Sequence, residues 1–340
     1  MINYLKTDLS ERLKKTNESA KMLGLQLDRY ISEIRSYRGI YQLYKSLNAE
    51  IPDTRWHYAL FEKTDKIWLK KASQFVPYLN RTLISVYPRL ALCNSLFVHD
   101  FIDERKMKSS PSALKRIIIK IISILLAKRL IFISKTSLRE FTNFYPKLAK
   151  LVLKYKKHTV IYNSADSVFY SQKKSEYPDT GPTKILYYGA WKGYKNFGSG
   201  VRQLEDQPNI QLTIIENGIE TDTALVNYLR SIFASVEFMR ADSSLELLEA
   251  IDRHQAVLYT SKLEGFGIPL LESALRERWV IVDKHLNVRS EFDYGNQIVL
   301  SNNLPRELLK LKTKPTIKFD QKLPKSSLEW AEQVIEFSEK

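Results

Sequence analysis

Apolar and polar positions follow two different periods along the chain. Short apolar runs typical of buried strands are separated by segments in which apolar residues recur with helical spacing, such as residues 9–34, 112–128 and 268–278. Strands that alternate with helices predict parallel βαβ units and hence an α/β fold. The predicted strands cover residues 2–5, 56–61, 82–87, 95–98, 130–133, 158–162, 185–188, 211–215, 236–239, 257–259 and 279–282.

Residues 171–183 interrupt this alternation. The segment is polar and contains two prolines and one glycine, which is the composition of an interdomain linker. A chain of 340 residues with 44% hydrophobic residues is long and apolar enough to form two globular domains. We therefore expect a first domain over residues 1–170 and a second that begins at residue 184.

The net charge of +15 is concentrated in the first half of the chain. Residues 1–165 hold 31 Lys and Arg against 13 Asp and Glu, a net charge of +18, whereas the remainder is at −3. Such asymmetry fits nucleic acid, an anionic membrane surface or a phosphorylated acceptor as a partner, and it also fits a solvated basic surface. The apolar helix predicted at 112–128 is flanked by lysines and arginines, so it either packs on the sheet or lies on a membrane surface.

Cysteine and histidine patterns argue against several kinds of site. Cys93 is the only cysteine, which excludes an intramolecular disulfide and fits a reducing compartment. The five histidines have no metal-ligand spacing, so no protein-held metal is expected. The N-terminus lacks the apolar core of a secretory signal, and no uncharged apolar run reaches the length of about 18 residues that a transmembrane helix needs. We therefore expect a cytoplasmic protein.

The most informative stretch is the glycine loop that follows the strand at 257–259. Gly265 and Gly267 allow positive φ and close backbone approach, and Pro269 suits the first turn of a helix. A loop that leads into a helix directs backbone N–H groups at one point, which is a site for phosphate. Glu264 and Glu272 flank the loop, and carboxylates bind sugar hydroxyls well. The alternative is a strand-to-helix turn with incidental acidic residues.

This stretch resembles the Glu-x7-Glu signature of retaining GT-B glycosyltransferases of the family 4 type, S-x-x-E-G-F-G-x-P-x-x-E. Further positions agree with that family. His99 and Asp100 follow a strand where the family often has V-H-D, and Ser134 matches the serine after the strand at 130–133. The matching signature positions are Ser261, Glu264, Gly265, Phe266, Gly267, Pro269 and Glu272.

The resemblance also has departures. The family's G-R-x-x-x-x-K-N loop is present as Gly189 to Asn196, but Ala190 replaces the arginine, which leaves Lys195 and Lys192 to neutralise the donor diphosphate. Arg240 stands where a small residue is usual. The family's first glycine loop is reduced to Gly39, for which a helix cap is an equally good account.

The resemblance implies two Rossmann-like domains with parallel sheets facing across a cleft, the second over residues 184–323, and a last helix at 324–340 that crosses back to the first domain. It implies transfer of a hexosyl group from a UDP- or GDP-sugar to a glycan or lipid-linked acceptor with retention, without metal or cofactor and without nucleic acid as a partner. Glu264, His99 and Lys195 are the expected catalytic residues. The expected donor-binding residues are Gly39, Gly189, Lys192, Lys195, Asn196, Arg240, Glu264, Gly265, Phe266, Gly267, Ile268 and Glu272.

Two alternatives remain open. A sugar-nucleotide epimerase or a phosphorylase has the same fold, but the first would need more cleft histidines and the second a pyridoxal lysine. A catalytically weakened sugar-nucleotide-binding protein is the other, and Ala190 and Arg240 favour it. In the enzyme hypothesis the protein builds a cell-surface polysaccharide, lipopolysaccharide or glycolipid, at the inner face of the membrane if the basic half binds lipid.

Overall fold

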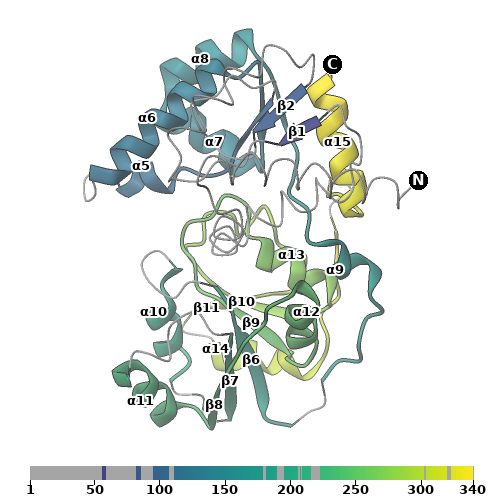
Figure 1. Cartoon of the computed structure of the whole chain (residues 1–340). Coiled ribbons are helices and arrows are strands. Elements are labelled where there is room, and N and C mark those ends of the chain that lie inside the picture. The colour runs from purple at the N-terminus through teal and green to yellow at the C-terminus, as the bar shows by residue number, and fades with distance from the viewer. Residues whose placement is uncertain are drawn as a thin grey trace, which may run out of the picture.

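A computed structural model gives the arrangement of the chain (Figure 1). The predicted elements at 2–5 and 9–34, Gly39, Ala190 and Lys192 lie outside the residues that it describes. The described residues are 56–58, 82–85, 95–106, 111–178, 181–189, 195–205, 207, 209–215, 223–301, 304–319 and 323–339.

Two parallel β-sheets form the two halves of the structure (Figure 1). The first sheet has the strand order β1-β2-β3-β4-β5, and the second has the order β11-β10-β9-β6-β7-β8. The first comprises β1 (Trp56–Tyr58), β2 (Thr82–Ser85), β3 (Ser95–Val98), β4 (Arg129–Phe132) and β5 (Lys157–Val160). The second comprises β6 (Thr183–Tyr187), β7 (Ile210–Ile215), β8 (Ser235–Met239), β9 (Ala256–Tyr259), β10 (Trp279–Asp283) and β11 (Gln297–Leu300).

Helices connect the strands and cover the sheets, as the alternating pattern predicts. The first half carries α5 (Ile102–Lys106), α6 (Pro111–Leu126), α7 (Lys135–Phe144) and α8 (Pro146–Tyr155). The short α9 (Ser167–Ser171) follows β5 and lies against α12 and α13 of the second half (Figure 1). The second half carries α10 (Phe197–Arg202), α11 (Thr223–Ile232), α12 (Ser244–Asp252), α13 (Ile268–Leu275), α14 (Leu304–Leu308) and the 3-10 helix η5 (Leu309–Lys312). The chain ends in α15 (Ser327–Glu339).

Three of the inner strands are buried along their whole length. All residues of β3, β9 and β10 are buried, as expected of parallel strands that are covered on both faces. Serine side chains fix the starts of two helices: Ser134 forms a capping box with Ser137 at α7, and Ser243 accepts a hydrogen bond from the N–H of Glu246 at α12. These caps fix the residues at which α7 and α12 begin.

Two buried arginines hold the segment between the halves against the second half. Arg276 donates to the carbonyl oxygens of Gln172 and Lys173 at 2.9 and 2.8 Å. Arg278 donates to the hydroxyl of Ser175 at 2.7 Å. The predicted linker at 171–183 is therefore held in place by hydrogen bonds in spite of its polar composition. Its first residue, Ser171, still belongs to α9, and its last, Thr183, already belongs to β6.

The helix predicted at 268–278 is shorter than its apolar period indicates. It ends at Leu275, and Glu277 has a φ of +54°, which an α-helix does not allow. The turn places Arg276 and Arg278 toward the connecting segment, a long-range contact that periodicity does not reveal. At the other end of the chain, α15 packs beside the first sheet, where the buried Trp330 lies 6.0 Å from Phe97 between ring centroids (Figure 1).

His254 provides a pH-dependent contribution to the stability of the second half. Its Nδ1 lies 2.6 Å from the carbonyl oxygen of Ala250, so Nδ1 carries the proton and Nε2 accepts from the hydroxyl of Thr213 at 2.8 Å. Burial lowers the pKa of His254 to about 4, below its usual 6.5. The unfolded chain therefore binds the extra proton first as the pH falls.

We expect this contribution to be complete above pH 6.5 and to be lost as the pH falls toward 4. The loss amounts to about 3 kcal/mol in the free energy of unfolding. Urea unfolding at pH 7 and pH 4.5 should show a smaller decrease for His254→Asn than for the wild type. His158→Asn, which changes an exposed histidine, is the control and should behave as the wild type does. The same pH dependence in His254→Asn and wild type would contradict this assignment.

Candidate functional site

The carboxyl ends of β6 and β9 bring together the two loops that carry most of the predicted site. The two strands are neighbours in the second sheet. Beyond them, the hydroxyl of Thr260 donates to the carbonyl oxygen of Lys195 at 2.6 Å, which ties one loop to the other. Carboxyl ends of parallel strands are where open α/β sheets bind ligands.

Lys195 and Glu264 face each other at this edge. The Nζ atom of Lys195 lies 2.7 Å from Oε1 of Glu264, and the side chains are only 21% and 13% exposed. The Lys195 ammonium also lies 5.9 Å from the centre of the Tyr259 ring. The pair therefore sits in a partly desolvated position where its mutual attraction is stronger than on an open surface.

The glycine loop adds the amino end of α13 to the same edge. Gly267 is the N-cap residue with a φ of +89°, a conformation that favours glycine, and Pro269 lies in the first turn. The first N–H groups of a helix have no partner inside the helix and carry a partial positive charge. Phe266, Gly267 and Ile268 are thus the residues at the position predicted for diphosphate binding.

Glu272 is the second acidic residue of the signature. It is the fifth residue of α13 and so belongs to the second turn of this helix. The residue is 6% exposed, and its carboxylate accepts a hydrogen bond of 2.7 Å from the hydroxyl of Tyr188. Tyr188 follows β6 directly and precedes Gly189, which has a φ of +118°. The two Glu side chains of the signature therefore have different partners, one cationic and one neutral.

The first half approaches the signature loop at Gly265. A Cβ atom at this position would lie 2.3 Å from the carbonyl oxygen of His99, so only glycine fits. The hydroxyl of Ser134 donates to the carbonyl oxygen of Gly265 at 2.5 Å. His99 thus lies at the loop through its backbone, and its imidazole stacks on Phe97 with ring centroids 6.2 Å apart.

Two other predicted donor residues lie farther out on the same side of the sheet. Asn196 has a left-handed φ of +54°, and its amide donates to Asp283 at the end of β10 at 3.1 Å. Arg240 is exposed and follows β8, the edge strand, two places from β6 in the sheet order. Of the predicted residues, Lys195, Glu264, Gly265 and the start of α13 are therefore brought together most closely.

Three residues with direct contacts to the site were not predicted. Tyr188 holds Glu272, Asp283 holds Asn196, and the amide of Asn287 holds the backbone of Glu264. Tyr188 and Asp283 share one detectable signal, because each lies at the carboxyl end of a predicted strand. Asn287 has no such signal, since it lies inside the irregular segment between β10 and β11.

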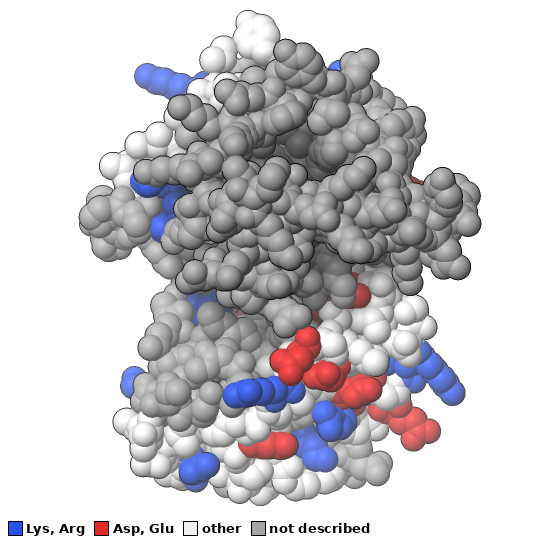
Figure 2. Space-filling model, in the orientation of Figure 1, with Lys and Arg blue, Asp and Glu red and all other residues white. Residues whose placement is uncertain are grey.

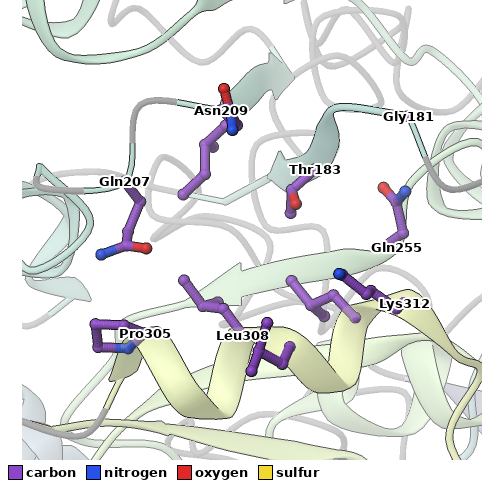
Figure 3. A pocket seen from close by; sticks show the side chains of 11 residues that line it. Gly181, Thr183, Gln207, Asn209, Gln255, Pro305, Leu308 and Lys312 are labelled. Carbon is purple, nitrogen blue, oxygen red and sulfur yellow. The ribbon is translucent and has the colours of Figure 1, made fainter.

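A pocket in the second half lies at the opposite end of the sheet (Figure 3). Thr183 and Ile210, at the starts of β6 and β7, line it together with Leu308 of α14 and Lys312 of η5. The site built around Lys195 and Glu264 is at the carboxyl ends of these strands. The pocket is therefore separate from that site.

Within the part of the chain that the structure describes, no group of three or more His, Cys, Asp or Glu residues has the arrangement of a metal site. Over the same described residues, none of the helices has both the length and the apolar character that crossing a bilayer requires.

Comparison with solved structures identifies the fold. WaaG, a glycosyltransferase involved in lipopolysaccharide biosynthesis, superposes with a TM-score of 0.59 at 12% identity over 89% of this chain and 91% of WaaG. Sucrose-phosphate synthase from Thermosynechococcus elongatus gives 0.54 at 14% identity, over 82% and 76% of the two chains. Anabaena HepE, solved with UDP and glucose, gives 0.52 at 14% identity over 87% and 75%.

These likenesses confirm the predicted fold class: the chain has the GT-B glycosyltransferase fold, with two α/β halves that each contain a parallel sheet. No protein-family model and no curated protein matches the sequence.

The contact at Gly265 can be tested by adding one methyl group. Gly265→Ala places a Cβ against backbone atoms of His99, which cannot move aside as a flexible side chain does. We expect the free energy of unfolding to fall by about 1–3 kcal/mol. Gly198→Ala is the matched control, because a Cβ there meets nothing within 4 Å and alanine favours a helix. Equal stability of the two variants in urea unfolding would show that the halves do not meet at Gly265.

Proposed function

We propose that this chain is a glycosyltransferase that moves a hexosyl group from a UDP- or GDP-sugar to a glycan or lipid-linked acceptor, with retention of the anomeric configuration. The observation that carries this proposal is the partly buried Lys195–Glu264 pair, joined at 2.7 Å beside the amino end of α13. A cation, a helix amino end and a carboxylate at one place suit a ligand with a diphosphate and a hydroxyl-rich sugar.

In this proposal the leaving diphosphate is stabilised by Lys195 and the N–H groups of Phe266, Gly267 and Ile268. These groups are positioned before the reaction, so they stabilise the developing negative charge without reorganisation. Lys192, Gly189, Asn196, Gly39 and Arg240 are further donor-binding residues in this proposal. Because the positive charge comes from the protein, the proposal needs neither a divalent metal nor a cofactor.

The two acidic residues have separate roles in the proposed reaction. Glu272 accepts hydrogen bonds from the ribose hydroxyls, and the hydroxyl of Tyr188 fixes its carboxylate for this purpose. Glu264 binds hydroxyls of the donor sugar and stabilises the positive charge of an oxocarbenium-like transition state. When the diphosphate enters, it competes for Lys195 and releases Glu264 toward the sugar. His99 positions the sugar or the acceptor from the first half.

The fold likeness to WaaG supports synthesis of a lipopolysaccharide, another cell-surface polysaccharide or a glycolipid as the setting of this activity. A sugar-nucleotide-binding protein with weakened catalysis is the second candidate, and Ala190 in place of the family arginine favours it. The two differ in whether a bound donor is turned over.

The test begins with thermal shifts for UDP, GDP, dTDP, ADP and their sugar conjugates. We expect one nucleotide to raise Tm, and its sugar conjugate to be cleaved. Lys195→Ala should weaken binding of that nucleotide by about tenfold or more, the loss of one charge-assisted contact. Lys184→Ala is the matched control, since this exposed lysine lies at the other end of β6.

Glu264→Gln should reduce turnover about 100-fold with little effect on nucleotide binding, and Glu272→Ala should mainly weaken nucleotide binding. Binding without cleavage or transfer would favour the weakened protein. No shift with any nucleotide would contradict a donor site.

We also propose that the first half binds an anionic membrane surface at the inner face of the cytoplasmic membrane. One face of α6 carries exposed Leu114, Ile118, Ile122 and Leu125, which follow each other at helical spacing. Exposed Lys115 and Lys128 flank this face, and α8 adds the exposed Leu151. The second half is different, because acidic and basic side chains are mixed on its visible face (Figure 2). Apolar side chains between basic ones suit the boundary between lipid headgroups and acyl chains.

Ile118→Ser with Ile122→Ser should weaken binding to vesicles with anionic lipid about tenfold, because both side chains would lose burial in the bilayer. Leu309→Ser is the matched control, an exposed apolar residue on the other half. Binding of the wild type should fall steeply with salt, since screening weakens the attraction of lysines to the surface. Equal affinity for neutral vesicles at high salt would contradict the electrostatic part of this proposal.

A further inference from the structure

The amide of Asn287 holds both backbone groups of Glu264. Its Oδ1 accepts from the N–H of Glu264 at 2.8 Å, and its Nδ2 donates to the Glu264 carbonyl oxygen at 2.9 Å. The backbone N–H of Asn287 also donates to the carbonyl oxygen of Lys262 at 3.1 Å. One side chain thus fixes the peptide groups on either side of the Glu264 Cα, and with them the direction in which the side chain leaves the backbone.

The same amide reaches across to the first half. Nδ2 of Asn287 donates to Oε1 of Glu140 in α7 at 3.1 Å. Glu140 is 5% exposed, and the same oxygen accepts from Arg105 at 2.9 Å. A buried carboxylate held by a charged partner has a fixed position. Asn287 therefore connects the backbone of Glu264 to a fixed side chain of α7 in the first half.

The segment that carries Asn287 is itself firmly packed. Val288 and Phe292 are buried, and the Phe292 ring lies 4.4 Å from Phe266 and 5.6 Å from Tyr162 between ring centroids. Phe266 belongs to the signature loop and Tyr162 to the first half. Glu291 in the same segment accepts from the N–H groups of Lys135 and Thr136, at 2.6 and 2.8 Å, and so caps α7 from the other half.

We propose that Asn287 is a positioning residue that sets the Glu264 carboxylate for reaction only while the two halves are in contact through Glu140. This inference rests on the proposed role of Glu264. The contact between the halves and the placement of Glu264 share one amide group, so loss of the Glu140 contact removes the bond that holds this amide in place from the first half. Glu291 lies in the same contact but makes no bond to Glu264, which gives a comparison within the chain.

Asn287→Asp keeps the acceptor for the Glu264 N–H, removes both Nδ2 bonds and places a second carboxylate beside Glu140. The assay is cleavage of the sugar nucleotide that raises Tm in the thermal-shift test. We expect kcat to fall about 10- to 100-fold, because a catalytic group is misplaced, and the KM for this donor to change less than about threefold. Asn287→Asp with Glu140→Gln should recover part of kcat, because a glutamine amide can donate to the new carboxylate. Asn143→Asp makes the same chemical change on the exposed side of α7 and should leave kcat unchanged.

Hydrogen exchange separates this inference from the proposed function. In Asn287→Ala the Glu264 N–H loses its acceptor, so exchange in residues 262–267 should accelerate by at least about tenfold, whereas Glu291→Gln should leave it near the wild-type rate. Unchanged exchange in Asn287→Ala, or a fall in kcat equal to that of Glu291→Gln, would overturn the inference. If exchange is faster in Asn287→Ala but the wild type cleaves no sugar nucleotide, the support of Glu264 by Asn287 would hold and the proposed glycosyltransferase activity would be rejected.

Discussion

The close approach of Gly265 to His99 is the contact on which the arrangement of the site depends. The carbonyl oxygen of His99, in the first half, occupies the place where any residue other than glycine at position 265 would have its Cβ. The hydroxyl of Ser134 donates to the carbonyl oxygen of Gly265 itself. Because both contacts are to backbone, they fix the path of the loop whichever way its side chains turn. The loop between β9 and α13 therefore belongs to both halves, although the chain places it in the second.

This shared loop explains why the two acidic residues have such different surroundings. Glu264 lies on the loop, where the partner of its side chain is Lys195 and the supports of its backbone come from Asn287 and, through Glu140, from the first half. Glu272 lies one turn into α13 and is buried against Tyr188 of the same half. The backbone of Glu264 is thus tied to a residue that contacts both halves, whereas Glu272 is held by a tyrosine of its own half.

Much of the fold was predictable because its signals are local. β3, β7, β9 and β10 each lie within a residue or so of the predicted apolar runs, and the caps at Ser134 and Ser243 follow from residue type alone. The signature predicted that Glu264, Gly267 and Glu272 lie around the start of one helix. The end of α13, the partner of Glu272 and the role of Asn287 depend on which strands are neighbours, and strand order is not written in local periodicity. His99 shows the same limit, because its position after a strand was predicted but the contact of its backbone with the signature loop was not.

The Lys195–Glu264 pair also resolves an apparent conflict in the signature. A carboxylate beside a helix amino end proposed to bind phosphate is unfavourable for that binding, because it repels the phosphate and competes with it for the partial positive charge of the helix end. Paired with Lys195 at 2.7 Å in a partly buried position, Glu264 is neutralised while no donor is present. In the proposed reaction, the diphosphate of the donor gives Lys195 a second anion and leaves the Glu264 carboxylate to interact with the sugar next to the phosphate. The negative charge of Glu264 is then available at the point where the proposed transition state develops positive charge on a sugar carbon, which is the condition for stabilising a transition state more than a ground state.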